Sequence, residues 1–135
     1  TADYTFAHES ASVKLSELAV GIGPFVVGPA VERKIGTSAF MHLSINATKW
    51  ESAKWAREKG LYSEVFSSVE EMDKAIMLLA MTLSFSNPEA MKELKKIAWT
   101  GTENWDELLA VRAAISGKLV LSDFTKEAIN KFKQK

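Results

Sequence analysis

Residues 3–29 read DYTFAHESASVKLSELAVGIGPFVVGP, from Asp3 to Pro29. The segment opens with aromatic and β-branched residues, which predict short strands over residues 4–7 and 12–15. It closes with an apolar run that glycines and prolines interrupt, so neither a regular strand nor a long helix can persist there. We therefore predict an ordered, buried loop after Glu17, with short strands before it and helices after it.

Composition limits the class of protein. The chain has 135 residues, of which 47% are hydrophobic, 17 are basic and 17 are acidic. This length suits one domain. A formal net charge of zero argues against a nucleic acid or an anionic membrane as the partner, and the lack of cysteine excludes disulfides and thiolate metal sites. Residues 18–31, the longest uncharged apolar run, are too short to cross a membrane, and residues 1–15 do not resemble a signal peptide. We therefore expect a soluble, cytoplasmic chain.

Signals for helix starts and ends dominate the remaining sequence. Pro29 predicts the start of a helix that ends at Gly36, and Thr37 predicts a second helix to about residue 43. Residues 48–51 and 68–71 have the pattern of capping boxes, and the first of these helices should end at Gly60. Residues 61–66 predict a strand. Three more helices are predicted to start at Asn87, at residues 102–104 and at residues 122–123.

Glu17 is the candidate catalytic residue. Its carboxyl group directly precedes the uncharged residues 18–31, where we expect little solvent. Desolvation raises the pKa of a carboxyl group and makes it a usable general acid or base near neutral pH. A partly exposed glutamate at the end of a strand is the ordinary alternative, and the residues alone leave both interpretations open.

Other polar and aromatic residues favour structural roles. His8 and His42 have no neighbours at metal-ligand spacing, so we predict no metal site. The glycines of residues 21–28 fit neither a dinucleotide fingerprint nor a phosphate loop, and they either allow tight turns or line a ligand pocket. The tryptophans are expected in the core or in a subunit interface, with nucleobase stacking as the alternative. The lysines of residues 126–135 form either a solvated face or a docking site for phosphates.

Several motifs occur in a fixed order along the whole chain. Residues 3–24 contain D-x-x-x-A and then a glutamate followed by x-x-x-G-x-x-P. Residues 33–36 read R-x-x-G, and residues 45–61 place Ile45, Ala47, Ala53, Ala56 and Gly60-Leu61 in the order of an I-x-A-x-x-A-x-x-x-G-L-V segment. Residues 127–135 read EAINKFKQK and fit the pattern E-G-x-x-A-F-x-E-K. As an ordered set, these motifs resemble the C-terminal half of the enoyl-CoA hydratase/isomerase (crotonase) superfamily.

The resemblance implies a fold and a set of site residues. The fold is the α/β crotonase (ClpP-like) ββα spiral, with residues 1–86 as the end of the spiral core and residues 87–135 as a helical region that forms trimers, commonly paired into hexamers. Glu17 matches the family glutamate that exchanges a proton with the substrate α-carbon. The other positions that match are an acyl-pocket group, Pro24, Phe25, Val26 and Val27, and a CoA-nucleotide group, Phe132 and Lys135. No cofactor is implied, because the coenzyme A thioester is the substrate.

The sequence also departs from the family pattern. Ser16 and Ala128 replace a proline and a glycine, and the loop from Pro24 to Pro29 resembles that of methylglutaconyl-CoA-type hydratases. The family's oxyanion hole and second glutamate belong to a front half that lies outside these residues. We therefore expect the intact parent to hydrate a short or branched 2-enoyl-CoA, and residues 1–135 alone to be inactive. The alternatives are an isomerase or acyl-CoA hydrolase on the same scaffold, or a non-catalytic helical assembly module.

Overall fold

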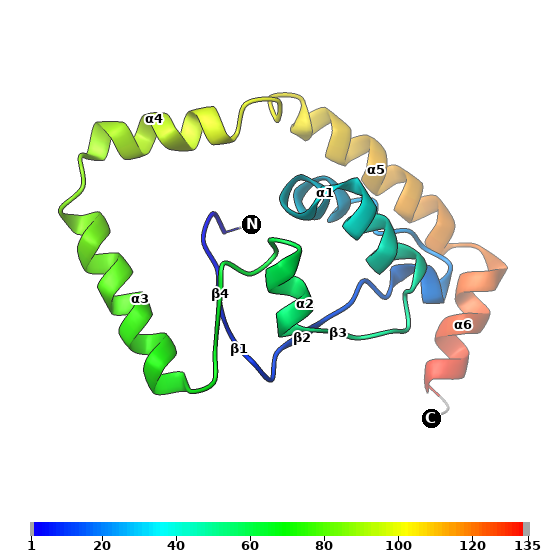
Figure 1. The fold of residues 1–135 in the computed structure, drawn as a ribbon. Coiled ribbons are helices and arrows are strands. Elements are labelled where there is room, and N and C mark those ends of the chain that lie inside the picture. The colour runs from blue at the N-terminus through cyan, green and yellow to red at the C-terminus, as the bar shows by residue number, and fades with distance from the viewer. Residues whose placement is uncertain (1, 134–135) are drawn as a thin grey trace.

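A computed structural model describes residues 2–133, with side chains through Lys131. Short strands form its centre (Figure 1): β1 (Phe6–His8) pairs in parallel with β4 (Glu64–Phe66), and β2 (Ser12–Val13) pairs antiparallel with β3 (Glu51–Ser52). The 3-10 helix η1 (Glu17–Val20) and the helices α1 (Gly28–Ile45) and α2 (Ala53–Glu58) accompany them. The predicted strands are therefore present but shorter than the sequence suggested.

Four further helices surround this centre. They are α3 (Val69–Ser84), α4 (Pro88–Ala98), α5 (Trp105–Val120) and α6 (Asp123–Lys133). Figure 1 shows them as an open arc, with α3 and α6 at opposite ends. The first end of the arc packs on the sheet, where α3 contacts β1 and β4, and the last end packs on η1, which α6 contacts. The arc therefore joins the strands to the segment that begins at Glu17.

Most predicted helix boundaries agree with the structure. The backbone breaks at Gly36, where φ is 76° and ψ is 160°, so the predicted pair of short helices is one kinked helix, α1. The Ser68 hydroxyl accepts a hydrogen bond from the Glu71 amide at the start of α3, and the Asn87 side chain accepts from the amides of Glu89 and Ala90 at the start of α4. Local side chains that accept from the first free amides set these boundaries.

The predicted capping box at residues 48–51 is wrong. Helix α2 begins at Ala53, and the Ser52 hydroxyl accepts from the Trp55 amide at 3.2 Å. Glu51 lies in β3, and its carboxylate accepts hydrogen bonds from His42 and Lys49, both at 2.8 Å. The carboxylate is therefore unavailable to close a box on Thr48, and the start of the helix moves to the next residue that can cap it.

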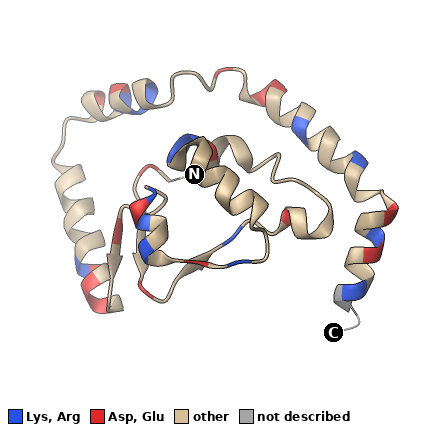
Figure 2. Cartoon of the chain, turned by 45° about the vertical axis from the view of Figure 1, so that its right-hand side comes forward, with Lys and Arg blue, Asp and Glu red and all other residues tan. Residues whose placement is uncertain are grey.

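The buried core is small. Its apolar members, each less than a tenth exposed, are Ala7, Ala39, Leu43, Ala47, Ala53 and Ala56. No residue of α3, α4 or α5 is buried, although α3 has no charged residue after Lys74, as Figure 2 shows. A helix with apolar side chains all around normally has neighbours on every side. Much of the apolar surface is therefore uncovered within the described part of the chain.

None of the helices in residues 2–133 combines the length and the hydropathy that a membrane crossing needs.

Candidate active site

Glu17 is the first residue of η1, and backbone hydrogen bonds of this short helix fix its position. The Glu17 carbonyl accepts a hydrogen bond from the Ile22 amide at 3.0 Å, and the Leu18 carbonyl accepts from the Gly21 amide at 3.1 Å. Gly21 can reverse the chain here because its φ is 81° and its ψ is 16°, in the left-handed region that favours glycine. The turn fixes where the Glu17 side chain starts.

Helix α6 secures this turn from outside. A Cβ atom added to Gly21 would lie 2.5 Å from a ring carbon of Phe124 and 2.9 Å from the Thr125 hydroxyl. Thr125 is fully buried, and its hydroxyl bonds with that of Ser122 at 3.1 Å. The close approach is possible because Gly21 has no side chain. The C-terminal helix therefore rests on the element that begins at Glu17.

The loop after η1 makes a second tight turn. The Phe25 amide donates to the Gly23 carbonyl at 2.8 Å, and the Gly28 amide donates to the Pro24 carbonyl at 2.8 Å. The Phe25 ring folds over Gly23, where an added Cβ would be 2.4 Å from the ring. Pro29 then lies in the first turn of α1, as predicted. Glycine and proline at these positions thus produce a compact loop that returns toward Glu17.

These residues line one pocket with a volume of about 450 Å³. Its wall contains Glu17, Ile22, Gly23, all four predicted acyl-pocket residues and Ser116 of α5. One carboxylate oxygen of Glu17, Oε2, is buried and has no hydrogen-bond partner among the described residues. A buried acceptor without a partner is costly, so a ligand that donates a hydrogen bond to this oxygen would relieve the cost. The structure brings the predicted catalytic residue and the predicted acyl-pocket residues together.

The expected burial of the loop is only partly found. Gly23, Pro24, Gly28 and Pro29 are buried, but Leu18 is 49% exposed, Val26 46% and Val27 40%. The loop presents its glycines and prolines to the interior, and its aliphatic side chains lie on the side that no described element covers. The apolar composition predicted a buried loop, but it did not predict which side of the loop other elements would cover.

The side chains of the two predicted CoA-binding residues lie outside the part of the chain that the structure describes. The backbone of Phe132 belongs to α6, but its side chain lies beyond the described ones, and Lys135 lies beyond the described residues. Sequence reasoning missed Ser116 and Arg112, which come from one face of α5. The Arg112 guanidinium donates to the Phe25 carbonyl at 3.4 Å. No local pattern marks either residue, because both lie about 90 positions beyond the loop in the chain.

The two histidines have local roles. The His42 imidazole bonds to Glu51 and stacks on Trp55, with ring centroids 5.4 Å apart. The hydrogen bond from His42, together with that from Lys49, holds the pKa of the Glu51 carboxyl below its usual range. His8 bonds to Ser10 and to the Ser67 carbonyl. In residues 2–133 no three metal-ligating side chains of His, Cys, Asp or Glu gather.

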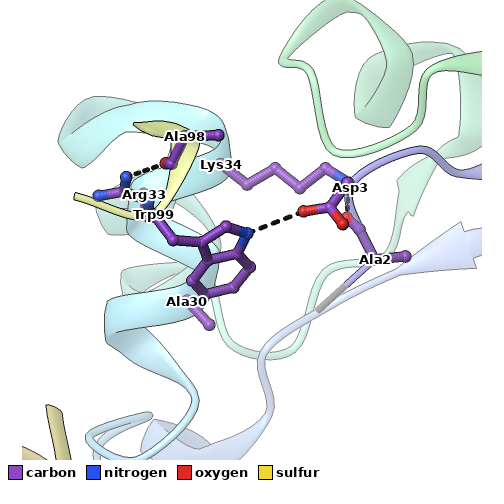
Figure 3. A pocket seen from close by; sticks show the side chains of 7 residues that line it. All are labelled: Ala2, Asp3, Ala30, Arg33, Lys34, Ala98 and Trp99. Carbon is purple, nitrogen blue, oxygen red and sulfur yellow. Dashed lines mark hydrogen bonds between the residues drawn. The ribbon is translucent and has the colours of Figure 1, made fainter. Parts of the chain in front are cut away.

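A group of polar contacts attaches α4 to the centre (Figure 3). The Arg33 guanidinium donates to the carbonyls of Ala98 and Thr100 at the end of α4. Asp3 accepts from the Trp99 indole at 2.9 Å and pairs with Lys95. These contacts hold the pKa of the Asp3 carboxyl below its usual range, mainly through the hydrogen bond from Lys95. Every charged group here has a protein partner, so this pocket is a structural joint.

The fold of this chain superposes on that of other solved proteins. An enoyl-CoA hydratase from Mycobacterium avium is 22% identical and superposes with a TM-score of 0.88, over 98% of this chain and 51% of that one. An enoyl-CoA hydratase/isomerase from Pseudoalteromonas atlantica T6c is 19% identical, with a TM-score of 0.85 over 98% and 53%. A carnitinyl-CoA hydratase from Mycobacterium avium is 21% identical, with a TM-score of 0.79 over 98% and 52%. The fold is therefore part of the α/β crotonase spiral, as predicted.

The sequence itself matches a family model over its whole length. The model describes enoyl-CoA hydratase/isomerase and matches residues 1–135. The chain belongs to the enoyl-CoA hydratase/isomerase family. No curated protein matches it. It spans about half the length of the solved structures it resembles.

Proposed function

We propose that this chain provides the proton-transferring part of an enoyl-CoA hydratase that acts on short or branched 2-enoyl-CoA thioesters. The observation that supports the proposal is the position of Glu17, whose Oε2 atom is buried without a partner in the wall of a largely apolar pocket. An acyl chain fits such a wall by composition. A carboxyl group at that place can exchange a proton with a carbon atom of an acyl chain bound in the pocket.

Hydration adds hydroxide to the β-carbon of the enoyl thioester and a proton to its α-carbon. In the proposed reaction the protonated Glu17 carboxyl gives its proton to the α-carbon and becomes a carboxylate, and it recovers the proton in the reverse direction. A second group must take a proton from the attacking water, and hydrogen-bond donors must stabilise the thioester oxygen. Glu17 is the sole carboxylate lining the pocket within residues 2–133. We therefore assign the activity to the complete natural gene product and propose that residues 1–135 alone are inactive.

The same resemblance supports the remaining parts of the proposal. Phe132 and Lys135 would contact the nucleotide of coenzyme A, and the thioester is a substrate, so no further cofactor is invoked. We place the enzyme in the cytoplasm as a trimer or hexamer. These assignments rest on matching positions in the family motifs.

An enoyl-CoA isomerase is the second candidate, and one observation favours it. An isomerase moves a proton from one carbon of the acyl chain to another, and a single carboxylate can perform both transfers. The pocket presents one carboxylate among the described residues. The two reactions differ in whether water enters the product.

The test uses the complete natural gene product with but-2-enoyl-CoA. Hydration removes the conjugated double bond, so its absorbance falls, and in ¹⁸O water the product gains one labelled oxygen, whereas an isomerase leaves the oxygen content unchanged. Glu17→Gln should lower kcat by about 10²–10⁴-fold with little change in CoA affinity. Glu9→Gln, a matched change at an exposed glutamate, should have no effect. Near-normal turnover by Glu17→Gln would refute the role of Glu17, and turnover by residues 1–135 alone would refute the need for the rest of the protein.

A further inference from the structure

Two pockets meet at the loop after η1. The Glu17 pocket has a volume of about 450 Å³, and a second pocket of about 480 Å³ lies against α1 and α5. Both are lined by the same four consecutive residues, Ile22 to Phe25. The far wall of the second pocket is mainly apolar and contains Leu18, Phe40, Met41, Ile45 and Leu119. Two charged residues, Glu32 and Arg112, also line it. The loop is therefore a thin wall between the site of Glu17 and a space that suits a hydrocarbon chain.

Phe25 provides the bulk of this wall. The tight turn at Pro24 directs its ring back over Gly23, where the ring occupies the position that a side chain on Gly23 would take. The neighbours Gly23 and Pro24 offer little side-chain volume of their own. Without the Phe25 ring, the wall would consist of Ile22, the smaller ring of Pro24 and loop backbone.

Arg112 of α5 contacts the backbone of Phe25. Its guanidinium donates to the Phe25 carbonyl at 3.4 Å, and it lies 3.4 Å from the point where a Cβ on Gly28 would be. Among the described side chains, no other side chain forms a hydrogen bond with residues 21–28. The same point beside Gly28 lies 3.0 Å from the Phe40 ring, so Gly28 packs between this ring and the guanidinium. Helix α5 therefore fixes the loop through one long side chain.

We propose that Phe25 is a partition that limits the length of the acyl chain accepted beside Glu17, and that Arg112 is the positioning residue that keeps this partition closed. The proposal rests on the proposed function, which supplies the acyl thioester. With the partition closed, short and branched acyl groups end at the Phe25 ring. With the ring removed, a longer straight chain passes into the second pocket and is bound there by apolar surface.

The test measures binding and needs no turnover. Saturated acyl-CoA thioesters from butanoyl to decanoyl are titrated by calorimetry into the complete natural gene product. For the natural protein, affinity should stop increasing with chain length once the chain reaches Phe25. For Phe25→Ala, and to a smaller extent Phe25→Leu, each further methylene should raise the affinity by about fourfold, as expected for burial of one CH₂ group.

Val26→Ala is the matched control, because Val26 lines the Glu17 pocket but not the second pocket. It should change affinity by the same factor for every chain length. Arg112→Met should lengthen the accepted chain as Phe25→Ala does but more weakly, and it should speed amide exchange at Phe25 and Gly28. Arg112→Lys, which retains a donor, should restore part of the natural profile.

The outcomes separate this inference from the proposed function. If the natural protein binds no acyl-CoA, the proposed function fails and the inference fails with it. If it binds acyl-CoA and Phe25→Ala and Phe25→Leu, both folded by circular dichroism, keep the natural length profile, the partition is refuted while the proposed function stands. If Arg112→Met leaves both the profile and the exchange unchanged, the positioning role of Arg112 is refuted.

Discussion

Substitution of Gly21 tests whether the C-terminal helix supports the element that begins at Glu17. Gly21→Ala has two costs. The first is conformational, because alanine at a φ of 81° costs about 1 kcal/mol or more in the left-handed region. The second is steric, because the new methyl group would lie 2.9 Å from the hydroxyl of the fully buried Thr125 and would displace the ring of Phe124, which is 66% exposed and 2.5 Å away. Such overpacking costs about 1–3 kcal/mol.

Gly101→Ala separates the two costs. Gly101 has a similar φ of 86°, and no atom lies within 4 Å of the position that its Cβ would take. This variant should therefore pay the conformational cost alone, about 1 kcal/mol. We expect Gly21→Ala to lower the free energy of unfolding by about 2–4 kcal/mol. The difference between the two variants then reports the contact between α6 and η1.

Equilibrium unfolding in urea, followed by circular dichroism, measures both free energies on the same chain. Amide exchange should also rise in η1 and at the start of α6 in Gly21→Ala and stay unchanged there in Gly101→Ala. If Gly21→Ala were no more destabilising than Gly101→Ala, α6 would not rest on η1 in solution. The account of how Glu17 is held in place would then be wrong.

Three other changes probe the helix caps, the buried carboxylate and the α4 joint. Asn87→Ala should lower the free energy of unfolding by about 1 kcal/mol, because α4 loses the acceptor for its first amides; an unchanged urea midpoint would contradict this. Glu51→Gln should flatten the loss of stability at acidic pH. The pKa of Glu51 is lowered by hydrogen bonds from His42 and Lys49, so the stability that its carboxylate provides is complete above the ordinary pKa of glutamate and is lost as the pH falls through the lowered value. A natural protein and a variant with parallel pH curves of unfolding would refute this. Arg33→Met should free the end of α4, seen as faster amide exchange over residues 88–98 with α1 unchanged; equal exchange would show that Arg33 does not hold the helix.

The helical part of the fold was predictable because its boundaries depend on local chemistry. Ser68 and Asn87 each accept from amides two or three residues away, so a short window of sequence contains the whole interaction. Thr48 fits the same pattern and still fails as a cap. The glutamate it needs is engaged by His42 and Lys49, and His42 lies in a different element from Glu51. A pattern of residue types cannot show that a distant side chain has already taken the partner.

The candidate site likewise contains some residues that the sequence predicts and others that it does not. Glu17 and the loop from Pro24 to Val27 are neighbours in sequence, and their turns at Gly21 and Pro24 bring them around one pocket. Ser116 and Arg112 reach the loop from α5, which gives no periodic signal that would distinguish them from other polar residues on a helix. Contacts of this kind become visible only when the path of the chain is known.

The distribution of burial supports the proposal that the activity belongs to a larger unit than the described residues. The apolar core consists of alanines and Leu43, and the largest fully buried side chain among the described residues is Thr125. At the same time Met77, Leu78, Met81 and Phe85 of the α3 region are more than half exposed.

Parallel strands are usually buried on both faces in sheets of several strands, whereas β1 and β4 form a pair by themselves within residues 2–133. The uncovered α3 and the unaccompanied strands β1 and β4 lie on one side of the molecule, where α3 packs on both strands. Further strands and helices placed there would bury both. The solved relatives are about twice as long. Under the proposed function, we expect the second acid and the oxyanion donors to come from elements that cover this apolar surface.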